Sequence, residues 1–282
     1  MKPVAILCLR NEEAYVGRAI RHLIEQGLLV AVIDNGSSDA TAGIVAGFSS
    51  REVIYRGKIE FEGAFGISRI LEAKAAVARE IGADWIIHHD ADEIMHSPVP
   101  GETLAEAALR IERSGANAIN FHEFVFVPTV ADQDFTGRDY VREMLHYYFF
   151  QPYYPRLILM YRSSLSNLAD AGHLVRGPGL KVHPQDFIKR HYIALSLAAL
   201  KRKYRHRQFP ADELAKGWHH NRAGIDWDPV TLPAVGRLKR LVAWDSRDFD
   251  TSDPWKQHFW ESAGRSFPQK VSGIERRDDG RP

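Results

Sequence analysis

Two aspartates, Asp90 and Asp92, are the residues of this sequence most suited to chemistry. They stand two positions apart, and in an extended backbone such side chains point to the same side. Paired carboxylates suit Mg²⁺ or Mn²⁺, whose coordination is completed by substrate phosphates. A solvated acidic turn is the ordinary alternative, but here the pair directly follows an apolar run at residues 85–89. We therefore predict a divalent metal at this pair, with Asp92 facing solvent and ligand rather than the core.

The segments before the aspartates alternate in a way that explains how the pair is positioned. Four short apolar runs indicate strands: residues 4–9, 28–33, 53–55 and 85–89. Helical spacing follows each of the first three, with starts predicted at Asn11 and near Asp39, and Gly82 ending the third helix. This pattern predicts an α/β fold with a mostly parallel sheet and ligands beyond the carboxyl ends of its strands. Three polar clusters should converge there: residues 10–13, 34–39 and 90–93.

The second half of the chain is less regular. We expect strands at residues 118–127 and 156–161, a weaker strand at 174–182 and a basic helix at 196–207. An aromatic stretch at 146–154 is expected to pack in the core or at a dimer interface, in preference to stacking on acceptor sugars. These elements are expected to complete the site.

Composition and charge exclude several classes of protein. The chain has 282 residues, 45% of them hydrophobic, and a formal net charge of +1, so no overall field would attract nucleic acid. Cys8 is the one cysteine, so no internal disulfide can form. No apolar stretch reaches the length of a membrane span, and the apolar start is too short for a signal peptide. We expect a cytoplasmic protein, with peripheral contact with the inner membrane and the oligomeric state left open.

Three segments occur in the order and spacing seen in glycosyltransferase family 2 and its relatives: VAILCLRNEEAYV, VAVIDNGSSDAT and GADWIIHHDADEIM. The sequence resembles this family, and RHYIALS followed by the basic helix looks like a subgroup of bacterial family 2-like enzymes. The resemblance implies the GT-A fold, a Rossmann-like sheet flanked by helices, here with a helical C-terminal extension. It also implies metal-dependent transfer of a hexose from a UDP-sugar or other nucleotide-sugar donor to a glycan or glycolipid acceptor, with inversion, as in polysaccharide biosynthesis.

The resemblance implies roles for individual residues in nucleotide binding. The loop that lines the nucleobase pocket corresponds to Leu9, Arg10 and Glu12. Asp34 matches the acidic residue that contacts uracil or ribose, although turn formation would also explain it. Asn35 stands where many relatives carry a second aspartate, so the identity of the base is left open.

The same resemblance extends to the diphosphate and the metal. Asp90 and Asp92 match the pair that contacts ribose and metal. Lys74 sits where relatives often place a basic residue near the nucleotide, with a solvated helix face as an equal alternative. GT-A enzymes often complete the metal shell with a histidine from the second half. His191 is the leading candidate and His173 the second, ahead of His183 and His219.

An inverting transferase also needs a carboxylate that deprotonates the acceptor hydroxyl. Asp170, in a loop, is the preferred candidate, and Glu123, inside a strand, is the alternative. The basic helix carries five cations that we interpret mainly as a solvated face: Lys201, Arg202, Lys203, Arg205 and Arg207.

We expect a GT-A domain at residues 1–215, with a nucleotide-sugar-binding half at 1–115 and an acceptor-binding half at 116–215. An extension or lid at 216–270 and a disordered tail at 271–282 would follow. Arg222 or His220, in the lid, could clamp phosphate. Two other functions remain open, a sugar nucleotidyltransferase and a non-catalytic nucleotide-binding protein of this fold. The first loop has no glycine, which argues against the nucleotidyltransferase.

Overall fold

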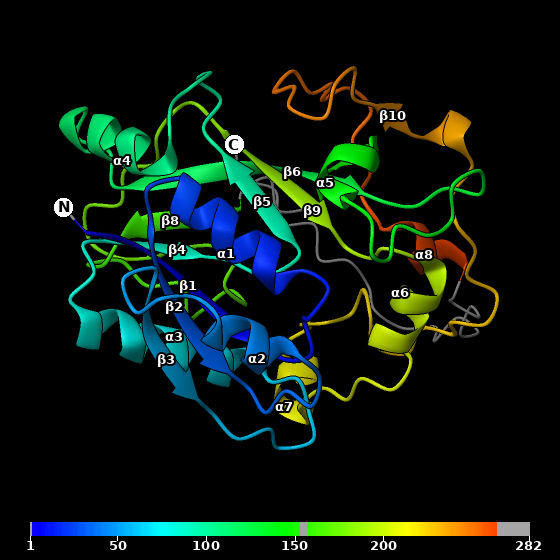
Figure 1. The fold of residues 1–282 in the computed structure, drawn as a ribbon, viewed down its shortest axis with the longest axis horizontal. Coiled ribbons are helices and arrows are strands. Elements are labelled where there is room, and N and C mark those ends of the chain that lie inside the picture. The colour runs from blue at the N-terminus through cyan, green and yellow to red at the C-terminus, as the bar shows by residue number, and fades with distance from the viewer. Residues whose placement is uncertain (1, 153–156, 264–282) are drawn as a thin grey trace, which may run out of the picture.

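The computed structural model describes residues 2–152 and 157–263, and a ten-stranded sheet runs through its middle (Figure 1). The predicted tail at 271–282 lies outside the described residues. Four neighbouring strands at one edge are parallel: β1 (Pro3–Leu9), β2 (Leu29–Asp34), β3 (Val53–Lys58) and β4 (Trp85–His88). Their order in the sheet is β4-β1-β2-β3, so the crossovers are those of an α/β fold. The α/β class with a parallel sheet at this edge is confirmed.

The rest of the sheet has mixed directions. The order continues from β4 through four strands: β8 (Ile158–Arg162), β6 (Ala118–Phe126), β7 (His146–Phe150) and β10 (Lys239–Arg240). Each of these pairs antiparallel to the strand before it. A branch leaves β6, to which β9 (Phe187–Tyr192) pairs in parallel, and β5 (Glu93–His96) pairs antiparallel to β9. This branch brings the second half of the chain to the end of β4.

Alternate residues of β1 face opposite sides of the sheet, and helices cover both. Ala5 and Leu7 belong to the core under three helices: α1 (Val16–Glu25), α2 (Thr41–Ala46) and α4 (Leu104–Arg113). Val4 and Ile6 belong to a second core, covered by α3 (Ile67–Ile81). In α1 the fully buried apolar residues are spaced three or four apart, which is the helical period. The apolar strands therefore position loops at their carboxyl ends by being buried on both sides.

Some predicted boundaries were wrong. The first helix begins at Val16, because Asn11 adopts a left-handed conformation (φ 56°) and its Oδ1 accepts a hydrogen bond from Ser38 N at 2.8 Å. The second begins at Thr41. The strand expected at 174–182 is absent from the described structure, where Arg176 and Val182 form only isolated bridges. Strand β5 was not predicted at all.

The C-terminal part packs into the body of the protein through a third core cluster. The short elements of this part are α6 (Leu197–Tyr204), α7 (Ala211–Ala215), the 3-10 turn Val235–Arg237 and α8 (Phe259–Ala263), whereas α5 (Tyr140–Glu143) packs in the first core. Trp227 and Trp260 are buried together with Tyr204 and with Val125 of β6. Tyr147, Tyr148 and Phe149 of β7 are buried too, as expected, whereas Tyr153 and Tyr154 lie outside the described residues.

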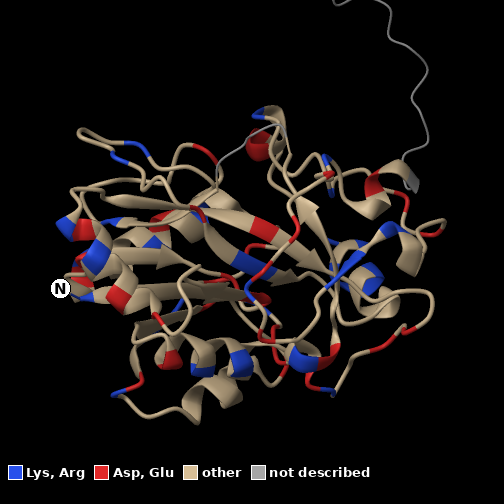
Figure 2. Ribbon diagram, turned by 90° about the horizontal axis from the view of Figure 1, so that it is seen from above, with Lys and Arg blue, Asp and Glu red and all other residues tan. Residues whose placement is uncertain are grey.

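Charge is distributed evenly over the molecule. Lys and Arg alternate with Asp and Glu around the ribbon (Figure 2), in keeping with the net charge of +1. Within residues 2–152 and 157–263, no helix is both long and apolar enough to cross a membrane.

Candidate active site

The ends of β1 and β2 bring the first two polar loops together. Leu9 pairs with Asp34 in the parallel register, and Asn35 N donates to Leu9 O at 2.7 Å. Arg10 extends across this junction, with Nη1 donating to Asn35 O at 3.1 Å and its guanidinium 3.5 Å from the centre of the Phe61 ring. The loops that the resemblance assigns to the nucleobase therefore lie side by side.

A tight turn after β4 places the acidic motif beside them. Asp90 N donates to Glu93 Oε2 at 3.0 Å, and β5 begins at Glu93. In the antiparallel pairing of β5 with β9, Glu93 lies opposite His191, and Tyr192 N donates to Asp92 O at 2.8 Å. The register of two strands thus brings His191 to the acidic motif.

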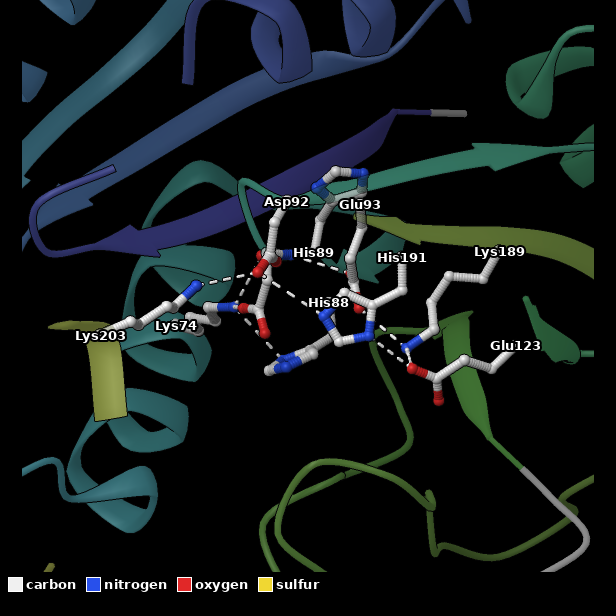
Figure 3. Close-up of polar contacts among 10 residues, drawn as sticks. Lys74, His88, His89, Asp92, Glu93, Glu123, Lys189, His191 and Lys203 are labelled. Carbon is white, nitrogen blue, oxygen red and sulfur yellow. Dashed lines mark hydrogen bonds and ion pairs between the residues drawn. The ribbon is translucent and has the colours of Figure 1, made fainter. Parts of the chain in front are cut away.

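The Asp92 side chain is buried, contrary to the expectation that it faces solvent. Only 5% of the residue is exposed. Lys203 Nζ lies 2.9 Å from Asp92 Oδ2, and His191 Nε2 lies 3.6 Å from the same oxygen. Lys203 comes from α6, so one cation of the basic helix that we assigned to a solvated face instead contacts the site (Figure 3).

His191 is held between two carboxylates (Figure 3). Its Nδ1 lies 2.6 Å from Glu123 Oε1, opposite the Nε2 that faces Asp92. Burial alone would lower the pKa of His191, but the Asp92 and Glu123 carboxylates raise it to about 10. The ring orientation is therefore determined by Glu123.

Lys189, which the sequence analysis missed, connects the remaining carboxylates. Its Nζ lies 2.9 Å from Glu93 Oε1 and 3.2 Å from Glu123 Oε1, and all three side chains are buried or nearly so. Buried charges are tolerated when each is paired in this way. Side chains two positions apart in a strand face the same side. The position of Lys189 two residues before His191 in β9 is therefore the sequence signal that could have identified Lys189.

Lys74 lies at the other aspartate. Although it projects from α3, only 5% of the residue is exposed. Its Nζ donates to His89 O at 3.1 Å, lies 3.4 Å from His88 Nδ1 and is 3.6 Å from Asp90 Oδ1. Lys74 is thus beside the acidic motif, and the alternative of a solvated helix face is wrong.

Two further candidates, Asp170 and His173, lie three residues apart in one turn. Asp170 makes two hydrogen bonds with Arg176, at 2.8 and 3.0 Å, and this pairing lowers the pKa of Asp170. His173 is a neighbour of Asp170, whose backbone oxygen accepts from His173 N at 2.9 Å. Burial, with the charge of Lys189, lowers the pKa of His173 to about 4.

Arg222 packs with its guanidinium 5.2 Å from the centre of the Tyr204 ring, and its buried Nε has no hydrogen-bond partner in the described structure. Two other predicted candidates differ from each other. His219 Nε2 lies 2.7 Å from Glu213 Oε2. The buried Nδ1 of His183, like Arg222 Nε, has no hydrogen-bond partner in the described structure.

The residues present fit a divalent metal of the kind implied by the resemblance. A metal-binding histidine commonly bonds a carboxylate through its second nitrogen, as His191 does with Glu123. Its Nε2 faces Asp92 and, with the pKa of His191 raised to about 10, would have to release its proton for a metal to bind there. Within the described part of the chain, no group of three His, Cys, Asp or Glu side chains could hold a metal by itself. Substrate phosphates would have to complete the coordination, which is the usual arrangement for Mg²⁺.

The parallel edge of the sheet and the acidic motif at its carboxyl end define an α/β protein with a GT-A-like fold. Residues 4–123 match the family model described as glycosyl transferase family 2. The resemblance inferred from the sequence is thus confirmed over these residues. None of the curated proteins compared with the chain matches it.

Among solved structures, S. aureus TarS (residues 1–349) in complex with UDP is similar, with 14% identity and a TM-score of 0.42. The similarity covers 69% of this chain, which spans 61% of that one. A Bacillus anthracis protein assigned as a glucose-1-phosphate thymidylyltransferase, in complex with sucrose, has 13% identity and a TM-score of 0.39, over 72% of this chain and 93% of that one. Similarities this distant carry no functional argument for this chain.

Proposed function

We propose that this protein is a metal-dependent glycosyltransferase that moves a sugar, with inversion, from a nucleotide-sugar donor to a hydroxyl of a glycan or glycolipid. The observation that carries the proposal is the arrangement of Asp92 and His191, 3.6 Å apart at the end of β4, with Glu123 bonded to the far nitrogen of the ring. It lies beyond the carboxyl ends of parallel strands, where α/β proteins bind nucleotides.

The nucleotide would be bound by the first two loops. We assign Leu9, Arg10 and Glu12 to one side of the base pocket, with Leu9 contributing its backbone because its side chain is buried, and Asp34 lies beside Leu9 in the parallel register. A cavity of about 350 Å³ begins at Asn35 and extends toward α3. Such a volume suits a nucleobase and part of its ribose.

The diphosphate would lie over Asp90 and Asp92. A bound Mg²⁺ or Mn²⁺, held by Asp92 and His191 beside Asp90, would neutralise the diphosphate and make it a better leaving group. Lys74 and Arg222 supply further positive charge near the same point. Lys74 is buried and Arg222 is partly buried, and in such positions an ammonium or guanidinium group binds phosphate more strongly than it does in water.

Deprotonation of the acceptor hydroxyl is assigned to Asp170. Asp170 is ionised at neutral pH, which is the form a base needs, but Arg176 holds both of its oxygens and would have to release one to the acceptor hydroxyl. Glu123 contacts Lys189 and His191 through Oε1. We assign Glu123 to orienting His191.

A thermal-shift experiment with nucleoside diphosphates tests this proposal. A ligand that binds only the native state raises the unfolding temperature in proportion to occupancy. We expect UDP or another nucleoside diphosphate to stabilise the protein with Mn²⁺ and much less with EDTA. No stabilisation by any nucleoside diphosphate in Mn²⁺ would contradict the proposal.

A further inference from the structure

The ammonium group of Lys203 stands between two carboxylates of the site. It lies 2.9 Å from Asp92 Oδ2 (Figure 3) and 3.3 Å from Glu12 Oε1. The side chain is only 20% exposed. The oxygen it contacts is also the one nearest to His191 Nε2. Lys203 is therefore paired with the carboxylate oxygen that a metal between Asp92 and His191 would use.

The fold holds Lys203 in this position. Ser196 caps α6, with its side chain accepting from Ala199 N at 3.1 Å, and Tyr204 is buried in the third core cluster. The Lys203 ammonium lies 5.7 Å from the centre of the Tyr15 ring and 5.9 Å from that of Tyr204, within range of cation–π attraction. This is not the geometry of a freely rotating surface lysine.

Other cations of the same helix are directed elsewhere. Lys201 Nζ donates to Asp228 O at 3.0 Å, and Arg205 pairs with the Asp228 carboxylate. The contact of Lys203 with Asp92 is thus specific to one position of α6, and Lys201 provides a matched comparison on that helix.

We propose that Lys203 is a built-in counter-cation that pairs with Asp92 in the nucleotide-free protein and competes with a divalent metal for that carboxylate. This inference rests on the proposed metal site. A divalent ion bound to Asp92 would lie within a few ångströms of the ammonium, and like charges at that distance in a poorly solvated site repel strongly. Metal alone therefore binds weakly, while a nucleoside diphosphate offers Lys203 an alternative anionic partner and allows metal and nucleotide to bind together.

Direct titration with Mn²⁺ tests the competition without any assay of activity. Free Mn²⁺ is measured by its electron paramagnetic resonance signal, in the absence of nucleotide, for wild type, Lys203→Met and Lys201→Met. We expect Lys203→Met to bind Mn²⁺ roughly tenfold more tightly or better, because one repelling charge is removed. Lys201→Met loses the same charge from the same helix and should bind as wild type does.

Two further variants locate the effect and guard against misfolding. Lys203→Arg keeps the charge and should keep the weak affinity, and adding Asp92→Asn to Lys203→Met should abolish the gain. If Lys203→Met is unfolded by circular dichroism, Lys203→Gln replaces it in the same titration.

An unchanged or weaker affinity in the folded Lys203 variant, with metal-dependent UDP binding intact in wild type, overturns the competition alone. Absence of Mn²⁺ binding by every protein, with and without UDP, overturns the metal site and this inference together.

Discussion

Glu123 Oε1 lies 2.6 Å from His191 Nδ1, and this contact determines which nitrogen of the ring faces Asp92. Replacing Glu123 by Gln keeps the shape but removes the charge that orients the imidazole. We predict that Glu123→Gln weakens Mn²⁺ binding in the presence of UDP by about 10- to 100-fold, the usual effect of losing such a partner. Glu112→Gln, which removes a half-exposed carboxylate paired with Arg162, is the control. Equal Mn²⁺ affinities of the two variants, measured by calorimetry, would show that Glu123 does not support the metal site.

Asp170→Asn should reduce sugar transfer by roughly 10²–10⁴ while leaving UDP affinity unchanged, because asparagine cannot accept the acceptor proton. The comparison needs Arg176→Met, which breaks the same ion pair but keeps the carboxylate. Transfer rates and donor affinities should be measured side by side. If both variants lose transfer rate equally, the loss comes from breaking the Asp170–Arg176 ion pair, and the base lies elsewhere.

Asp92→Ala should abolish turnover, and the buried position of the side chain adds a cost in stability. The substitution leaves the Lys203 ammonium and the His191 ring without their shared carboxylate. Removing one partner of a buried charged pair typically lowers the free energy of unfolding by about 3–5 kcal/mol. We expect a loss at the lower end, because Lys203 is already partly exposed to solvent. Urea unfolding of Asp92→Ala and of Asp228→Asn, a surface control, measures the difference. A fully active or equally stable Asp92→Ala protein would contradict the assigned contacts.

Acid should destabilise the protein through His22. This residue of α1 is 4% exposed, and burial lowers its pKa from 6.5 to about 4. The unfolded chain therefore binds a proton at a higher pH than the folded protein does. Stability contributed by neutral His22 is intact above pH 6.5 and is lost as the pH falls toward 4, by up to about 3 kcal/mol.

His22→Leu should flatten this part of the stability profile, although it also loses the hydrogen bond between His22 Nε2 and Met95 O, at 2.8 Å. Urea midpoints between pH 7.5 and 4.5 give the slope. His206→Leu, at an exposed position of the chain, is the control and should keep the wild-type slope. Identical slopes for His22→Leu and wild type would show that His22 does not carry the effect.

The parallel half of the fold could be predicted from sequence because its strands and helices alternate locally, and the acidic motif directly follows an apolar strand. The rest of the site depends on contacts that local pattern does not encode. Strand β5 has only four residues and pairs with β9, whose Lys189 lies 96 residues away from Glu93. Lys203 is 111 residues from Asp92, on a helix whose charge run is typical of a solvated surface. Periodicity identified that helix but could not show which of its cations contacts the acidic motif.

The account as a whole is tested most directly by measuring release of nucleoside diphosphate from a panel of nucleotide sugars in Mn²⁺, with acceptor supplied as a mixture of glycans. We predict release from at least one donor, a fall of tenfold or more in EDTA, about 1.4 kcal/mol, and none with Asp92→Asn. Consumption of sugar 1-phosphate and nucleoside triphosphate in place of nucleoside diphosphate release would identify a nucleotidyltransferase, and absence of both reactions a binding protein. Either result would contradict the glycosyltransferase assignment.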